Sequence, residues 1–331
     1  GRFNMRKVLL TTTALVAFGG VSAASAIDIS GTYMFDYTIN DNGTANTGGN
    51  NNTSMSQDAR IVFSGSTTSD AGLTFGGAVA LDATGTTEDS GIYMSGDFGY
   101  VMMGGTDGVV DGMDGFMHAA GPTEIGAGTV GSAAVNLNGN ATLTDGATTE
   151  KVGYRSPAIS GFQFGVSHQE AGRTSKADNN QWIVTYDFGV AKVGYAQANI
   201  GAAAGTSAET NQKQMGLGTS FGDFGFKYAT GTDTTKTTAG GESSKIDTNN
   251  WGVTYGGIEN VSLYYSGVAS EEKTGTNAGD KLDSTTIGLS YTIAPGVSAL
   301  IESGNNDYTD SSATTGNDQS NYTRLGLSVN F

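Results

Sequence analysis

The last eleven residues, NYTRLGLSVNF (residues 321–331), decide the fold. Their side chains alternate in character at a period of two, which the 3.6-residue period of a helix does not fit. Since a β-strand turns successive side chains to opposite faces, the segment predicts a strand with one apolar and one polar face. The first face carries Thr323, Leu325, Leu327, Val329 and Phe331, and the second carries Arg324, Gly326, Ser328 and Asn330.

The same alternation recurs along the chain, for example in residues 60–64, 224–228 and 286–293. The blocks are about ten residues long, the length of a tilted membrane-spanning strand. Seven short turns alternate with eight long loops rich in Thr, Asn, Asp and Gly, which predicts sixteen strands with both termini on the short-turn side. The predicted turns are residues 69–72, 96–99, 156–161, 187–189, 222–225, 256–260 and 294–296. The predicted loops are residues 40–56, 84–89, 107–149, 171–178, 201–211, 232–246, 272–282 and 307–320.

The composition narrows the function classes. The 331 residues include 16 Lys+Arg and 32 Asp+Glu, and the net charge of −16 argues against a nucleic-acid partner because phosphate binding needs clustered cations. The lack of cysteine excludes thiolate metal sites, disulfide scaffolds and cysteine nucleophiles. Beyond the N-terminal segment no apolar run reaches the roughly 20 residues of a spanning helix, a test that a closed β-barrel escapes.

The N-terminal segment has the three parts of a secretory signal peptide. Arg6 and Lys7 form a positive region, residues 8–18 an apolar core, and residues 24–26 a small-residue cleavage signal. We expect residues 1–26, the signal peptide with the residues that precede it, to be removed. The expected mature chain, residues 27–331, carries 13 basic and 32 acidic residues and is therefore strongly acidic.

An open sheet of sixteen strands would leave long unpaired edges, and the sequence predicts no second layer to cover them. We therefore expect an all-β fold, a closed antiparallel transmembrane barrel of sixteen strands. The faces with Ile61, Leu289 and Leu327 suit lipid, and the opposite faces suit water. Short turns at one rim and long loops at the other are typical of outer-membrane barrels, and sixteen strands leave a lumen wide enough for water.

Three segments resemble the general diffusion porins of Gram-negative bacteria. KVGYRSPAISGFQFGVSH (residues 151–168) resembles their tyrosine, Ser-Pro, Gly-Phe hairpin, and SGDFGYVMMGGTDG (residues 95–108) resembles their fourth and fifth strands leading into the third loop. ARIVFSGSTTSDAGLTFGGAV (residues 59–79) resembles their second hairpin. Phe331 resembles the C-terminal signal that the barrel assembly machinery reads. The overall resemblance is closest to α-proteobacterial porins such as those of photosynthetic purple bacteria.

The resemblance implies a homotrimer in outer-membrane lipids whose third loop, residues 107–149, folds inward to form a constriction. Acidic residues on that loop would face basic residues on the wall. The hairpin departs from the family at Gly153, where a base is common, and carries its charge at Arg155 instead. The loop acids are Asp107, Asp111, Asp114, Glu124 and Asp145. The alternation places the wall bases Arg60, Lys151, Arg155, Lys192, Lys227 and Arg324 toward the lumen.

These features predict passive passage of ions and small hydrophilic solutes with a preference for cations, and no catalysis or resident cofactor. One alternative is a channel selective for a sugar or oligosaccharide, which needs an aromatic track that the sequence does not indicate. Another is a secreted or surface-layer calcium-binding β protein, and loop carboxylates could hold calcium within a porin as well. The aromatic residues near strand ends are instead interpreted as interfacial girdles: Tyr93, Tyr100, Tyr154, Phe162, Tyr186, Phe188, Phe221, Phe224, Tyr255 and Tyr291.

Overall fold

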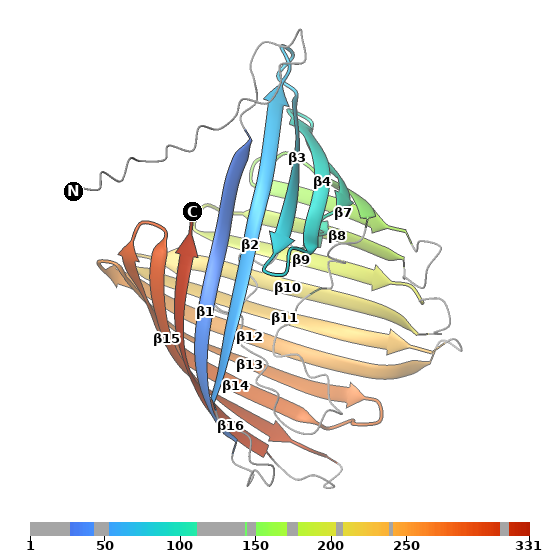
Figure 1. Ribbon diagram of the computed structural model, residues 1–331. Coiled ribbons are helices and arrows are strands. Elements are labelled where there is room, and N and C mark those ends of the chain that lie inside the picture. The colour runs from blue at the N-terminus through green and yellow to red at the C-terminus, as the bar shows by residue number, and fades with distance from the viewer. Residues whose placement is uncertain are drawn as a thin grey trace, which may run out of the picture.

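The computed structural model describes residues 27–42, 53–110, 143, 150–170, 178–202, 208–237, 241–311 and 318–331. Its strands form one sheet that closes on itself, with β1 paired to both β2 and β16, which confirms the predicted sixteen-stranded barrel (Figure 1). No helix among these residues is long and apolar enough to cross a membrane. The strands are β1 (Asp28–Asn42), β2 (Thr53–Thr68), β3 (Thr74–Asp82), β4 (Thr87–Gly96), β5 (Gly99–Gly105), β6 (Glu150–Arg155), β7 (Phe162–Gln169), β8 (Asn179–Asp187), β9 (Ala191–Ile200), β10 (Glu209–Phe221), β11 (Phe224–Lys236), β12 (Glu242–Ile258), β13 (Val261–Thr274), β14 (Lys281–Ala294), β15 (Val297–Thr309) and β16 (Asp318–Asn330).

The closing seam joins the first strand to the last. β1 and β16 are antiparallel, with Phe35 opposite Leu327. At the end of the seam Gly31 and Phe331 exchange backbone hydrogen bonds of 2.9 and 3.0 Å. A Cβ at Gly31 would lie 2.7 Å from the Phe331 ring, so the glycine leaves the space that this ring occupies.

The two faces of the barrel differ as the alternation predicts. In β14, Ile287 is 61% exposed while Thr286 is 3% exposed, because the outer face has no protein cover and the inner side chains pack on one another. Large apolar side chains on the outer face include Phe63, Val79, Ile92, Met215, Leu217, Ile301, Leu325 and Leu327. Buried polar side chains on the inner face include Gln181, Gln214, Asn250, Ser270, Asn306 and Glu302. This arrangement suits lipid outside and water inside.

The seven predicted short turns all fall at junctions between consecutive paired strands. The junction of β6 and β7 shows why glycine is needed there. Gly161 has a φ of +88°, and its carbonyl accepts a 2.9 Å hydrogen bond from the amide of Asp187. Because a Cβ at Gly161 would collide with the Asp187 carbonyl oxygen, only glycine fits this turn without strain.

Several predicted long loops are wrong in their bounds, because strand residues extend into them. Most of residues 232–246, predicted as a loop, belongs to β11 and β12, which end at Lys236 and begin at Glu242. The polar composition indicated a loop, yet these residues continue the antiparallel register. Thr232 lies opposite Asp247, and its hydroxyl donates a 2.9 Å hydrogen bond to that carboxylate. Polar residues can extend a strand beyond the membrane, where neither of its faces contacts lipid.

The barrel therefore has walls of two heights (Figure 1). We call β3 to β9, with 6 to 10 residues each, the low wall. We call β10 to β16, with 13 to 17 residues each, the tall wall. β1 and β2, with 15 and 16 residues, continue the tall wall across the closing seam.

Candidate functional site

The described parts of the predicted third loop lie against the inner face of the low wall and of the nearby strand β11. Val109 and Val110 are 2% and 1% exposed, and Leu143, near the other end of the loop, packs against the same apolar cluster. The strand residues of this cluster are Ile183, Ala196 and Ala229. Their neighbours in each strand point outward, so the loop contacts the wall from inside the barrel. The predicted acids Asp111, Asp114, Glu124 and Asp145 lie outside the described residues.

Two polar contacts hold the start of the loop in place. The amide of Val109 donates a 3.2 Å hydrogen bond to Ser167 Oγ on β7. Lys151 on β6, 4% exposed, donates from Nζ to the carbonyl oxygen of Thr106. Lys151 was predicted as a wall base, and the structure places it on the inner face, where it anchors the loop.

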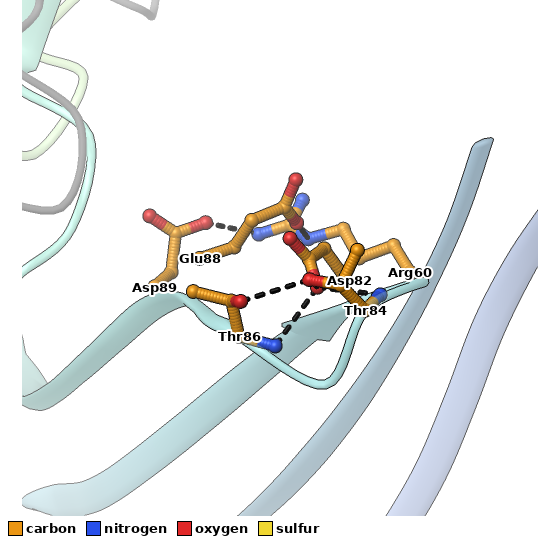
Figure 2. A network of polar contacts seen from close by, with 6 residues as sticks. All are labelled: Arg60, Asp82, Thr84, Thr86, Glu88 and Asp89. Atoms are coloured by element: carbon orange, nitrogen blue, oxygen red, sulfur yellow. Dashed lines mark hydrogen bonds and ion pairs between the residues drawn. The ribbon is translucent and has the colours of Figure 1, made fainter.

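Arg60 faces inward from β2 but is paired with carboxylates. Its Nε lies 3.1 Å from Glu88 Oε2, and its Nη2 contacts Asp89 Oδ2 (Figure 2). Asp82, opposite Arg60 in the register of β2 and β3, accepts hydrogen bonds of 2.8 Å from the Thr84 and Thr86 amides instead. The result is a charge-compensated cluster at the tip of the β3–β4 hairpin.

Arg324 on β16 is also paired, in a more buried setting. Its Nη2 contacts Glu302 Oε1, and the Glu302 side chain is fully buried. Tyr264 on β13 donates a 2.6 Å hydrogen bond to the other oxygen of Glu302. Glu302 lies directly opposite Arg324 in the register of β15 and β16. Arg324 thus belongs to a buried network on the inner face of the tall wall.

The remaining three predicted wall bases line cavities near the short-turn rim. Arg155 lines one cavity together with Asp107 and a second cavity together with Lys192. Its Nη2 lies 3.5 Å from the carbonyl oxygen of Val109. Lys192 and Lys227 lie on one rung of the sheet, separated by Gly218, and line a third cavity of about 370 Å³. Of the six predicted bases, these three line the hollows along the inner face.

Two aromatic residues assigned to the interfacial girdle face inward instead. Tyr93 lies opposite Met102, and Tyr100 lies opposite Arg155, all on the inner face. Their rings stack with centroids 5.3 Å apart and planes at 26°. The girdle interpretation is wrong for Tyr93 and Tyr100 because their flanking residues, such as Ile92, take the outward positions.

Sequence reasoning missed the acids that neutralise the wall bases. Glu88 and Asp89 were counted within a loop, and Glu302 was not singled out. A signal for Glu302 existed: it alternates with the outward residue Ile301, so its strand parity places it inside. Among the described residues no group of three or more His, Asp or Glu side chains is arranged to hold a metal ion.

Comparison with known proteins now identifies the family. A family model described as Gram-negative porin matches residues 11–330. The chain belongs to this Gram-negative porin family. A comparison with curated proteins found no match. The porin is therefore an outer-membrane β-barrel channel, and its short-turn rim is the periplasmic one.

Several solved barrels resemble this porin closely in fold. The trimer form of OmpT, an outer membrane protein of Vibrio cholerae, gives a TM-score of 0.71 at 13% identity, covering 93% of this chain and 100% of that one. An anion-selective porin from Comamonas acidovorans gives 0.70 at 14% identity, with the same two coverages. A mutant of the Rh. blastica porin gives 0.60 at 15% identity, covering 92% and 100%. At these identities the likeness establishes the fold.

Proposed function

We propose that this porin is a general diffusion channel that passes ions and small hydrophilic solutes passively and favours cations. The observation that carries the proposal is the largely polar inner face of the barrel, within which both described parts of the third loop pack on an apolar cluster. In this proposal the loop narrows the lumen and so sets a size limit. Its function is transport without catalysis and without a resident cofactor.

The cation preference rests on charge. The chain carries a net charge of −16, and Arg60 and Arg324 are already paired with carboxylates on β4 and β15 respectively. The loop acids Asp107, Asp111, Asp114, Glu124 and Asp145 would add negative potential in a narrow passage, where low-dielectric walls focus the field. Arg155, Lys192 and Lys227 oppose this preference locally at the periplasmic end.

Planar-bilayer recording of the purified protein tests the proposal directly. We expect stepwise conductance increases and, in a salt gradient, a reversal potential with the sign of cation selectivity. Absence of stepwise conductance would overturn the proposal of a diffusion channel. A reversal potential of the opposite sign would overturn only the proposed cation preference. Polyethylene glycols of increasing size then measure the size limit.

Assembly is proposed to follow the family pattern, a homotrimer inserted by the barrel assembly machinery. One structural neighbour is described as a trimer form. Phe331 is the proposed assembly signal, supported by its exposed ring at the closing seam, 64% accessible. Phe331→Ser should reduce the heat-dissociable trimer in outer membranes while synthesis and export continue. Unchanged outer-membrane levels would contradict this role.

A further inference from the structure

The inner face of the low wall carries an aromatic platform close to the periplasmic rim. Tyr93 lies over Gly76 of β3, so closely that a Cβ at Gly76 would collide with the Tyr93 ring. Tyr100 stacks beside Tyr93, and its side chain remains 38% exposed. Glycine at position 76 thus gives Tyr93 room against the wall, and Tyr93 in turn supports Tyr100.

The ring of Tyr100 borders a cavity of about 260 Å³ that polar side chains also line. The cavity reaches from β5 and β6 to the start of the third loop. Gly153 also lines the cavity and leaves room for the Met102 side chain, because a Cβ there would come within 2.6 Å of that side chain. The polar side chains that line the cavity are Thr106, Asp107 and Arg155.

The polar groups provide both hydrogen-bonding roles. Arg155 is a fixed planar donor with several N–H groups, Asp107 is an acceptor, and Thr106 can do either. No carboxylate among the described residues forms an ion pair with Arg155, whereas Arg60 and Arg324 both have one. An aromatic face beside a donor and an acceptor in one cavity suits a solute with an apolar ring face and hydroxyl groups around its edge.

We infer that this cavity is a binding subsite for a pyranose sugar in the permeation pathway. The C–H groups on one face of a pyranose carry weak positive charge and lie favourably on the negative face of an aromatic ring. The ring hydroxyls reach Arg155 and Asp107, and the cavity volume, slightly below the usual range for drug-sized ligands, suits one sugar ring. Tyr100 contacts the sugar, and Tyr93 is a positioning residue that holds the Tyr100 ring.

The inference rests on the proposed function, because a sugar reaches the subsite only through an open lumen. It adds preference among neutral solutes to a pathway otherwise governed by size and charge. A weak site of this kind raises the local concentration of sugar and still releases it, as conduction requires.

The test compares D-glucose with mannitol as blockers of the ion current through the purified wild-type porin in planar bilayers. The two probes are similar in size and hydroxyl content, but mannitol is acyclic and offers no ring face. We expect glucose to reduce the mean current and increase current noise at about tenfold lower concentration than mannitol. This ratio corresponds to about 1.4 kcal/mol, within the range of one aromatic contact. Equal effects of the two probes, with normal ion conductance, would overturn the subsite and leave the channel standing.

Variants then assign the effect to the platform. Tyr100→Leu should raise the half-blocking concentration of glucose about tenfold. Tyr100→Phe, which keeps the ring, should leave it within about twofold, and Tyr93→Phe should likewise preserve it while Tyr93→Leu weakens binding. The matched control is Tyr195→Leu, which removes one ring of the outward-facing Trp182–Tyr195 pair, whose centroids are 5.1 Å apart. Glucose block that survives Tyr100→Leu, or is lost equally in Tyr195→Leu, would overturn the assignment.

Discussion

The tall and low walls use their inner faces differently. On the tall wall several polar side chains are paired across strands: Thr248 and Ser270 are 2.9 Å apart, and Ser284 donates a 2.7 Å hydrogen bond to Asn306. On the low wall the inner face contacts the third loop and includes the cavities lined by Arg155. Inward orientation alone therefore does not make a residue available to solutes.

The strongest test of this distinction breaks the buried pair of the tall wall. Glu302→Ala leaves Arg324 without its carboxylate inside a packed network, and removing one partner of a buried ion pair typically destabilises by about 3 to 5 kcal/mol. Urea unfolding of the folded barrel in detergent measures the change.

The matched control for Glu302→Ala lies at the more exposed Arg60 cluster. Glu88→Ala should cost less than about 1 kcal/mol, because solvent screens its ion pair with Arg60. Equal losses of unfolding free energy in the Glu302 and Glu88 variants would show that the buried tall-wall network stabilises the barrel no more than the exposed hairpin cluster does.

A second test concerns the two faces of one tall-wall strand. Leu327→Arg places a charge on the lipid face and should destabilise by about 2 to 4 kcal/mol if the position is near the bilayer midplane. Ser328→Arg, one residue further on the inner face, should assemble and instead change conductance. Unfolding and single-channel recordings of both variants check this, and similar losses of stability would refute the assigned faces.

A third test concerns the loop at the top of the tall wall, outside the membrane-spanning segments. Asp280 is buried, which by itself would raise its pKa, but hydrogen bonds from Tyr308, Ser311 Oγ and the Ser311 amide hold that pKa below its ordinary value. The carboxylate therefore stabilises the loop above about pH 4 and loses this effect as the pH falls through the lowered pKa.

Asp280→Ala should accordingly destabilise the loop by about 1 to 3 kcal/mol at pH 7 and by less at low pH. Hydrogen exchange of the Ser311 amide, which donates a 2.8 Å bond to Asp280, reports the effect. Loss of Ser311 protection that is the same at pH 7 and at pH 2 would contradict the role of the charged form.

The smallest expected effect concerns charge selectivity. Neutralising Asp111 and Asp114 together should lower the cation-to-anion permeability ratio in dilute salt, with the change shrinking toward 1 M, where the Debye length is about 3 Å. Neutralising Glu271 and Asp283, on the outer face of the tall wall, is the control. If the control variant changes the reversal potential more, the third loop is not the constriction.

Much of the fold could be predicted because alternation and turn chemistry are local properties. Leu325 and Leu327 identify a strand face without knowledge of any partner, and glycines such as Gly161 identify a turn. The extent of polar strands could not be predicted, because Thr232 becomes a strand residue only through its pairing with Asp247.

The candidate site was harder to predict because it depends on cross-strand partners. The inward positions of the six bases follow from the alternation of side chains along each strand. Their roles depend on cross-strand neighbours such as Glu302, which lies 22 residues before Arg324 in sequence. Tyr93 was misassigned because the run Ile92, Tyr93 and Met94 is hydrophobic throughout and hides the alternation. Inward aromatic residues require the register to be known.

The hydrogen bonds between Gly31 and Phe331 have a consequence for biosynthesis. These residues are 300 positions apart, so the ring of strands closes only after both β1 and β16 have been synthesised and exported. Until then β1 and the most recent strand both present free backbone edges, which can pair with other chains. Such long-range closure slows folding and prolongs the exposure of apolar outer faces. Covering these edges and apolar faces until closure would therefore reduce pairing with other chains.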